Sequence, residues 1–296
     1  MRLTFDADVE EFRAEFAAFL DANLPPEADT VERSRSSAHI PAWARRWQRL
    51  LFDEGWLLPG NPPEFGGRNA DLLQQFVHLE ELARRGVYHS FNPQGLSIIA
   101  ASLLSFGTDA QKHRWAVPIL RAEITASVGM SEPGAGSDLA SLRTRAVLDG
   151  DHFVLNGQKI WTSGAHDADI ILAFVRTDPD APKHRGISVL VVPTDSPGLT
   201  RRPFGTMLAT TDQDFNEVFF DDVRVPAANL IGELNQGWAV ANGSLGHERT
   251  MMWLSFATSL ETIARNFHPR TEIGDQHYAT LCMDGQAVRL LGSAAL

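Results

Sequence analysis

Apolar residues recur at intervals of three and four along the first part of the chain, which is the spacing of amphipathic helices. After Asp6 and Asp8, which suit a helix N-cap, the first apolar stripe comprises Val9, Phe12, Phe16, Phe19 and Leu20. We interpret this stripe as a core-facing surface rather than a ligand wall. Further helices are expected to contain residues 43–51, 72–83 and 96–106, and to begin again near 108. The pattern predicts an all-helical N-terminal domain over residues 1–123.

Short alternating runs of apolar and polar residues replace this spacing from Ile124 onward and indicate β-strands. We expect strands at Ile124–Met130, Arg143–Leu148, Phe153–Leu155, Ile170–Val175, Ile187–Val192 and Val218–Val225. Turn signals separate the runs, including Asn156-Gly157. Several short strands at this spacing predict an antiparallel β-barrel or sandwich. The central domain is expected to span residues 124–232.

Helical spacing returns from about Asn235, where one apolar face comprises Ala241, Leu245, Met252, Phe256 and Ile263. A loop and a further helical stretch from about Gln276 follow. Two helices cannot enclose a four-helix core, so apolar faces near Leu281 and Leu290 are expected to be exposed unless a partner covers them. We therefore predict an α+β multidomain protein whose residues 233–296 form a partial C-terminal helical bundle.

The charge and cysteine content narrow the classes of function. With 26 basic and 37 acidic residues, the formal charge is 26 − 37 = −11 and the pI is about 5.3, which argues against sequence-independent nucleic-acid binding. The single cysteine, Cys282, excludes an intrachain disulfide and fits a reducing compartment, so we expect a cytoplasmic protein. We interpret Cys282 as a small core residue. No apolar run reaches transmembrane length, and the N-terminus lacks a signal-peptide pattern.

A glycine-rich stretch, Met130-Ser-Glu-Pro-Gly-Ala-Gly-Ser-Asp138, follows one of the predicted strands. Gly134 and Gly136 are expected to free the backbone for positive φ and for close approach to a ligand. Successive N–H groups in such a turn form a small anion-binding concavity, and Ser131 and Ser137 add hydroxyl donors. By itself the stretch is either a ligand loop or a tight connection.

The run SEPGAGSDLA at residues 131–140, followed by NGQKIWTSG at residues 156–164, closely resembles the flavin-binding segments of the acyl-CoA dehydrogenase family. The resemblance extends over essentially the whole chain. It implies FAD, oxidation of the Cα–Cβ bond of an acyl-CoA thioester to a trans-2-enoyl product, and electron transfer to an electron-transfer flavoprotein. The chain also resembles an actinobacterial branch that forms complexes of two related subunits, often in steroid side-chain degradation. A homo- or hetero-oligomer is therefore expected.

The resemblance assigns roles to individual residues. Met130 and Ser131 match positions that contact the flavin ring, and Ser137 matches a serine near the flavin and the pantetheine of acyl-CoA. Trp161 matches a tryptophan that packs against the isoalloxazine, as flat aromatic rings do. Ser163 matches a hydroxyl that contacts the flavin. The turn and helix start at Asn92–Leu96 match a segment that lines the acyl pocket.

Glu248 is the expected general base. It falls in the apolar helical stripe, where a carboxylate is costly unless it is used, and burial raises a carboxyl pKa toward the working pH. The isovaleryl-type branch of the family carries its glutamate in the matching Glu-Arg pair, so Arg249 is expected near the substrate. The alternative is a solvated ion pair on an exposed helix. We expect no metal site, because His247 has no second ligand one helical turn further on.

Two other functions remain open from the sequence: a non-catalytic partner subunit of a heteromeric acyl-CoA dehydrogenase, and a flavin oxidase or monooxygenase on the same scaffold. The adjacent pair Glu80-Glu81 suggests catalytic carboxylates at first sight. Adjacent residues on a helix point in different directions, so we interpret the pair as solvated surface charge.

Overall fold

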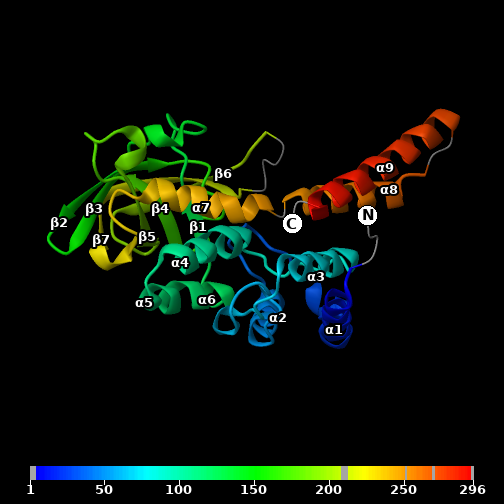
Figure 1. Cartoon of the computed structure of the whole chain (residues 1–296). Helices are drawn as coiled ribbons and strands as arrows, with labels where there is room; N and C mark the ends of the chain where they lie inside the picture. The colour runs from blue at the N-terminus through cyan, green and yellow to red at the C-terminus, as the bar shows by residue number, and fades with distance from the viewer. Residues whose placement is uncertain (1–4, 208–212, 251, 269–270, 295–296) are drawn as a thin grey trace. The chain divides into compact units, whose positions relative to one another are not determined.

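The computed structural model describes residues 5–207, 213–250, 252–268 and 271–294, without the side chains of residues 28, 244–250, 252–255, 258, 262 and 292–294. The chain divides into two compact units, which are described separately (Figure 1). The first unit combines Met1–Pro25, Leu51–His89 and Glu248–Leu296. The second combines Pro26–Leu50 and Ser90–His247. The domain boundaries expected at residues 123 and 232 stay predictions.

The first unit is helical and contains α1 (Ala7–Asn23), α3 (Leu72–Arg84), α8 (Met252–Asn266) and α9 (Glu272–Ala294). The apolar stripe predicted for α1 is confirmed, because Val9, Phe12, Phe16 and Leu20 are buried. Phe16 packs on the fully buried Trp56 with ring centroids 4.7 Å apart. Asp71 and Gln74 form a reciprocal capping box that fixes the start of α3.

A buried histidine lies in the core of the first unit. His78 is 2% exposed, its Nε2 donates to the Trp56 carbonyl oxygen at 2.8 Å, and its ring lies 4.3 Å from that of Phe16. Burial and, to a smaller extent, the nearby His89 lower the pKa of His78 to about 3, although the hydrogen bond to Trp56 opposes the shift. In the folded chain the imidazole ring therefore stays neutral well below pH 6.5, where a free imidazole is protonated.

This histidine predicts a loss of stability in acid. Its folded-state pKa lies below the ordinary 6.5, so the unfolded chain binds the proton first as the pH falls. The contribution of His78 is complete above pH 6.5 and declines between pH 6.5 and 3, by about 1.4 kcal/mol per pH unit. Urea unfolding at pH 7 and at pH 4.5 should show this slope in the wild type and a smaller one in His78→Gln. Equal slopes would contradict the assignment.

Along the chain, the helices of the second unit precede and follow its strands. They are α2 (Ala42–Asp53, whose last turn belongs to the first unit), α4 (Ala101–Phe106), α5 (Asp109–Gln111), α6 (Val117–Leu120) and α7 (Gly237–Thr250, whose last three residues belong to the first unit). Turns of π-helix, Gly95–Ala100 and Lys112–Ala116, precede α4 and α6. Short 3-10 turns occupy Glu27–Thr30, Leu139–Ser141, Lys183–Arg185 and Ala227–Asn229, and a further one, Pro63–Phe65, belongs to the first unit. The helix expected over 96–106 is confirmed, and the helix expected to begin near 108 starts at a capping box formed by Thr108 and Gln111.

The sheet of the second unit has eight strands: β1 (Ala126–Gly129), β2 (Arg145–Asp149), β3 (His152–Lys159), β4 (Ile170–Arg176), β5 (Ile187–Pro193), β6 (Leu199–Phe204), β7 (Phe215–Pro226) and β8 (Leu230–Ile231). Their order is β6-β7-β3-β2-β4-β5-β8, with β1 also paired to β4. The sheet is sandwich-like and does not close into a barrel. It is not purely antiparallel as expected, because β1 and β2 share one edge of β4 and both run parallel to it.

A β-bulge lets both halves of β7 face the same core. Opposite β3, the pairing changes from Leu155–Val223 to Gly157–Phe220, so β7 holds one extra residue. Asp222 takes up the bulge with φ of 50° and accepts from Asn156 at 2.9 Å. The prediction that Asn156-Gly157 forms a turn between strands is therefore wrong, because the two residues lie inside β3 opposite the bulge.

Gly157 is required by a close approach of the backbone. Its φ is +149°, and a Cβ there would lie 2.7 Å from the Cα of Thr144. Gly157→Ala is expected to cost about 3 kcal/mol of unfolding free energy, from overpacking and backbone strain together. Gly150→Ala is the matched control, since Gly150 also has positive φ but open space around it, so strain alone should cost about 1 kcal/mol. Equal losses in the two variants would refute the steric argument.

Alternating residues of five strands build the core of the second unit. It comprises Ala146, Phe153, Leu155, Ala165, Ile171, Ala173, Val175, Leu190, Val192, Val218, Phe220, Val223 and Val225. The predicted strands at residues 153–155, 170–175, 187–192 and 218–225 are confirmed. Strand β6 was not predicted, because its sequence, Leu-Thr-Arg-Arg-Pro-Phe, is largely polar and half-exposed and contains a proline, as suits an edge strand.

The C-terminal helices differ from expectation in which side chains they bury. Ala241 of α7 is buried, but Phe256 and Ile263 of α8, predicted on the same face, are exposed. Leu281 and Leu290 of α9 are themselves half-buried, but Met283 and Leu291 beside them are exposed, as expected for apolar surface in this region. Cys282 is exposed, so its prediction as a core residue is wrong. Within the described ranges, every helix is too short or too polar to cross a membrane.

Candidate functional site

The structure brings the two sequence motifs of the second unit together. Met130 and Ser131 follow β1, and Ile160 follows β3 thirty residues later. The amide of Ile160 donates to the carbonyl oxygen of Ser131 at 2.9 Å, so the residues next to Trp161 lie against the start of the glycine-rich turn. Ser137 lies further along this turn and is exposed. The predicted proximity of the two motifs is thus present in the backbone itself.

Trp161 is the most unusual residue of this region. Its φ is 60°, a left-handed conformation that is rare for a bulky side chain and costs about 1–3 kcal/mol. The indole is 54% exposed. One edge is held by two rings at centroid distances of 5.1 Å and 5.4 Å, those of Phe204 on β6 and Phe215 on β7. A strained backbone thus presents a large aromatic side chain to solvent, between two rings that fix its orientation.

The residues after Trp161 carry an unusual hydroxyl. Thr162 is fully buried, and its Oγ1 has no hydrogen-bond partner among the residues that the structure describes. Its backbone pairs with that of Asn216 in both directions, so the threonine is fixed in place. The carbonyl of the next residue, Ser163, accepts from Ser127 Oγ of β1 at 2.7 Å. Sequence reasoning assigned a role to Ser163 and overlooked Thr162.

The glycine-rich turn is built differently from the expectation. The Glu132 and Ala135 backbones exchange hydrogen bonds of 2.9 and 3.0 Å, which close a tight turn over Pro133 and Gly134. Neither Gly134 nor Gly136 has positive φ, so that part of the prediction is wrong. A Cβ built on either glycine would meet open space, since both lie on the outer side of the turn. Their backbone is therefore accessible from solvent.

A buried ion pair under this turn was missed by the sequence analysis. Lys159, at the end of β3, is fully buried and donates from Nζ to Met130 O at 3.0 Å and to Glu132 Oε1 at 2.8 Å. The Glu132 carboxylate also accepts from the amides of Arg143 at 2.6 Å and Thr144 at 2.8 Å. Strand alternation is the signal that reveals the lysine, because residue 159 has the same parity as the core residues 153 and 155.

The charges of this pair depend on one another. Burial lowers the pKa of Lys159 to about 8, Glu132 opposes this shift, and Arg176 adds to it. Burial raises the pKa of Glu132, but the ammonium of Lys159 and the hydrogen bonds outweigh burial and hold the pKa below its usual value. Arg176 donates to the carbonyls of Ala140 at 2.6 Å and of Leu142 at 3.3 Å, and so supports the end of the turn.

The segment Asn92–Leu96, which the resemblance places at an acyl pocket, is anchored to β1. Asn92 is buried, accepts from the Ala126 amide at 2.9 Å and donates to the Ala126 carbonyl at 2.9 Å. Gln94 Oε1 accepts from the Val128 amide at 3.2 Å. These two side chains satisfy the edge of β1 that faces away from β4. The segment is thereby fixed beside the strand that leads into the glycine-rich turn.

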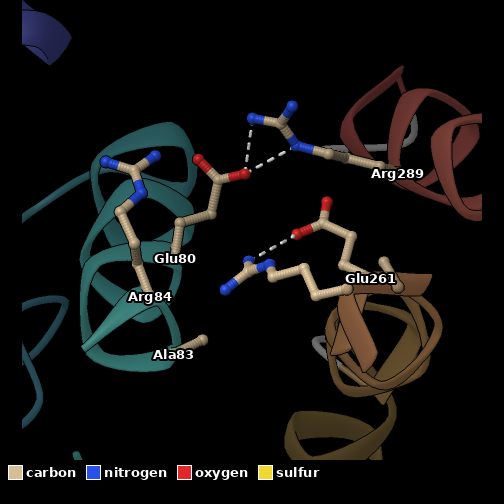
Figure 2. Close-up of a pocket in the computed structure, with 7 residues that line it drawn as sticks. Glu80, Ala83, Arg84, Glu261 and Arg289 are labelled. Atoms are coloured by element: carbon tan, nitrogen blue, oxygen red, sulfur yellow. Dashed lines mark hydrogen bonds and ion pairs between the residues drawn. The ribbon is translucent and has the colours of Figure 1, made fainter. Parts of the chain in front are cut away.

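The side chains of His247, Glu248 and Arg249 lie outside the described residues, although their backbone belongs to α7. The role of Glu248 as base and of Arg249 near the substrate stay predictions. A pocket in the first unit contains none of the predicted site residues. It is lined by Glu80, Ala83, Arg84, Ala257, Glu261, Arg265 and Arg289 (Figure 2). Its carboxylates are paired within the pocket: Glu80 accepts from Arg289 Nε at 2.6 Å, and Glu261 lies 3.5 Å from Arg265.

The interpretation of Glu80-Glu81 as solvated surface charge is wrong. The side chain of Glu81 is 2% exposed and that of Glu80 is 10% exposed. Arg13 of α1 donates to both carboxylates at 3.1 Å, and Arg84 and Arg85 also bind Glu81. The two carboxylates point in different directions, and arginines of the first unit pair with each of them. These ion pairs compensate the cost of burying the charges. The pair is structural.

Comparison with known proteins agrees with the two motifs. The family model of the acyl-CoA dehydrogenase N-terminal domain matches residues 6–123, and that of the acyl-CoA dehydrogenase middle domain matches residues 127–223. The chain is 37% identical over 256 residues to acyl-CoA dehydrogenase FadE26 of Mycobacterium tuberculosis (strain ATCC 25618 / H37Rv). That alignment covers 85% of this chain and 63% of the relative, so the chain spans less than two thirds of the relative's length.

Two solved structures have a similar fold. The Tcur3481-Tcur3483 steroid ACAD is 35% identical with a TM-score of 0.79, and the match covers 99% of this chain and 77% of that chain. The ChsE4-ChsE5 complex from Mycobacterium tuberculosis is 31% identical with a TM-score of 0.77, over 99% of this chain and 77% of that chain. The chain belongs to the acyl-CoA dehydrogenase family, and its helical and sheet domains have that family's fold.

Proposed function

We propose that the chain is a FAD-dependent acyl-CoA dehydrogenase that converts an acyl-CoA thioester to the trans-2-enoyl thioester. The observation that carries the proposal is the backbone junction between Ser131 and Ile160, beside which Trp161 is held in a strained, half-exposed conformation. A binding surface for a flat ring needs such a fixed aromatic platform next to backbone and hydroxyl groups. Strain of this kind is typical of functional sites.

The residues of the second unit fit a flavin. The exposed indole of Trp161 offers a stacking surface, and the open backbone at Gly134 and Gly136 leaves room for close approach. The Thr162 hydroxyl, which has no hydrogen-bond partner among the described residues, is a further group able to bind a polar ring edge. Met130, Ser131, Ser137 and Ser163 are the other residues that we assign to the cofactor, and Ser137 also to the substrate. When bound, FAD supplies the two-electron oxidant that accepts the β-hydride.

The remaining chemistry belongs to side chains. We assign the removal of the α-proton to the carboxylate of Glu248, and we assign Arg249 to the substrate. A general base of this kind works best when burial raises its pKa toward the working pH. Electron-transfer flavoprotein is the acceptor that we infer for the reduced enzyme, and acyl-CoA is the substrate class. One of the similar structures is a steroid ACAD, so steroid side-chain thioesters should be tested first, together with fatty acyl thioesters.

Anaerobic reduction of the flavin by substrate tests this proposal. The purified chain, loaded with FAD, is titrated with straight-chain, branched and steroidal acyl-CoA thioesters, and the products are identified by mass spectrometry. We expect bleaching of the flavin absorbance by at least one thioester, with one enoyl product per flavin reduced. Bleaching without an enoyl product, or hydrogen peroxide formation in air at the rate of turnover, would point to the oxidase alternative.

A second candidate is a non-catalytic subunit that stabilises an active paralogue. The similarity to the ChsE4-ChsE5 complex favours this alternative, because that assembly contains two differently named chains. The exposed apolar side chains of α8 and α9, including Phe256, Ile263, Met283 and Leu291, are compatible with a hetero- or homo-oligomer. Replacement of Glu248 distinguishes the two candidates, since only an active subunit needs this carboxylate.

A further inference from the structure

We infer that the buried Lys159–Glu132 ion pair is a positioning device that holds the glycine-rich turn against the tryptophan-bearing segment, and that flavin affinity depends on it. This inference rests on the proposed function for its second half. Its first half, the fixed position of the turn, concerns the chain alone. Neither residue is assigned to contact the cofactor, so both act through the backbone of Met130 to Ala135.

The pair joins three separate stretches of chain. Lys159 lies immediately before Ile160 and donates to Met130 O, at the end of β1. Glu132 lies in the turn itself and accepts from the amides of Arg143 and Thr144, just before β2 begins. The amide of Ile160 also donates to the carbonyl oxygen of Ser131. The residues between β1 and the turn are therefore bonded both to the end of β3 and to the start of β2.

The backbone groups involved explain why charged residues occupy a buried place. Met130 O and the amides of residues 143 and 144 lie just beyond strand ends, where no neighbouring strand satisfies them. A carboxylate can accept two amides and an ammonium at once, and an ammonium can donate to a carbonyl while it pairs with the carboxylate. The stem of Lys159 passes Gly129, whose added Cβ would be 3.5 Å from Lys159 Cγ.

The energetic balance favours positioning over stabilisation as the role of the pair. Burying two charges costs several kcal/mol per ion, and apolar residues of similar volume often give equal or greater stability. Apolar residues, however, cannot hold Met130 O or the two amides in place. The third charged group beside the pair is Arg176, whose guanidinium lowers the pKa of Lys159. Arg176 holds the far end of the turn through Ala140 and Leu142.

Two variants and one control test the inference. Lys159→Met keeps the length of the side chain and removes its charge and donors. Lys159→Met with Glu132→Gln removes both charges, so that no unpaired buried charge threatens folding. The matched control is Lys183→Met, because Lys183 binds Asp138 of the same turn at 3.1 Å, but both side chains are 61% exposed. Exposed pairs of this kind contribute little.

Hydrogen exchange without ligand and FAD titration are the two readouts. In both Lys159 variants we expect amide exchange over residues 129–136 to accelerate about tenfold or more, and FAD to bind about tenfold more weakly, while the control stays within about twofold of the wild type. Wild-type exchange in both Lys159 variants, or wild-type FAD affinity in the folded double variant, would overturn the inference. Should the wild type bind no FAD, the proposed function fails, while hydrogen exchange still decides whether the pair fixes the turn.

Discussion

Replacing Glu248 by glutamine is expected to lower the rate of enoyl-thioester formation by a factor of about 10²–10⁴, which is the usual contribution of a positioned general base. Glutamine has the shape of glutamate but cannot take up the α-proton. Because Glu248 is not assigned to the cofactor, the variant should bind FAD as the wild type does and show the same flavin absorbance. Rapid-mixing measurement of flavin reduction by a saturating acyl-CoA thioester gives the rate directly.

The control for this variant is Glu261→Gln, which removes a carboxylate from α8 whose partner, Arg265, is itself largely exposed. Its rate should stay within about twofold of the wild type, because an exposed ion pair of this kind contributes little. A Glu248→Gln chain that reduces its flavin at the wild-type rate would exclude this residue as the base. Unchanged turnover by a complex of the variant with a second subunit would favour the non-catalytic role.

Replacing Trp161 by alanine is expected to weaken FAD binding about thirtyfold, from the loss of about 2 kcal/mol of aromatic contact. The stability of the chain without flavin should change by less than about 1 kcal/mol, because the indole is 54% exposed and only one side of it packs on the rings of Phe204 and Phe215. Trp161→Phe should restore most of the affinity, since a smaller ring can still stack. Fluorescence titration with FAD and thermal unfolding measure the two effects separately.

Trp238 offers a matched control within the second unit. It is a half-buried tryptophan whose ring makes an edge-to-face contact with that of His184, with ring centroids 4.5 Å apart. Trp238→Ala should lower stability without changing FAD affinity. Equal affinity losses in the Trp161 and Trp238 variants would show that weaker binding follows from general destabilisation, and would contradict the role of Trp161 as a platform.

Periodicity was a sound guide to the fold wherever a segment buries one continuous face. The stripe around Phe12 and Phe16 and the strand at Ile170–Arg176 lie where their spacing predicted them. Position alone could not reveal how charged side chains are used. Glu81 is buried because arginines from α1 and α3 surround it, and Cys282 is exposed because α9 turns another face inward. Such outcomes depend on tertiary neighbours that a linear pattern does not contain.

The sequence predicted which two motifs of the candidate site come together, but it did not predict how their backbone and buried side chains are arranged. The motifs around Ser131 and Trp161 do meet, as the resemblance implied. The left-handed backbone of Trp161 could not be foreseen, because nothing in Trp-Thr-Ser-Gly requires it. Lys159 was within reach of simple reasoning, since it continues the inward alternation of Phe153 and Leu155. A lysine is usually assigned to the surface, and that expectation concealed the buried pair.

Equilibrium titration of the 296-residue chain with FAD shows whether the flavin site exists. We expect saturable binding of one FAD per chain, with quenched flavin fluorescence in the wild type and clearly weaker binding in Trp161→Ala. A folded, flavin-free chain that leaves the fluorescence of added FAD unchanged would contradict the claim that the turn at Met130–Asp138 and Trp161 together form a flavin site.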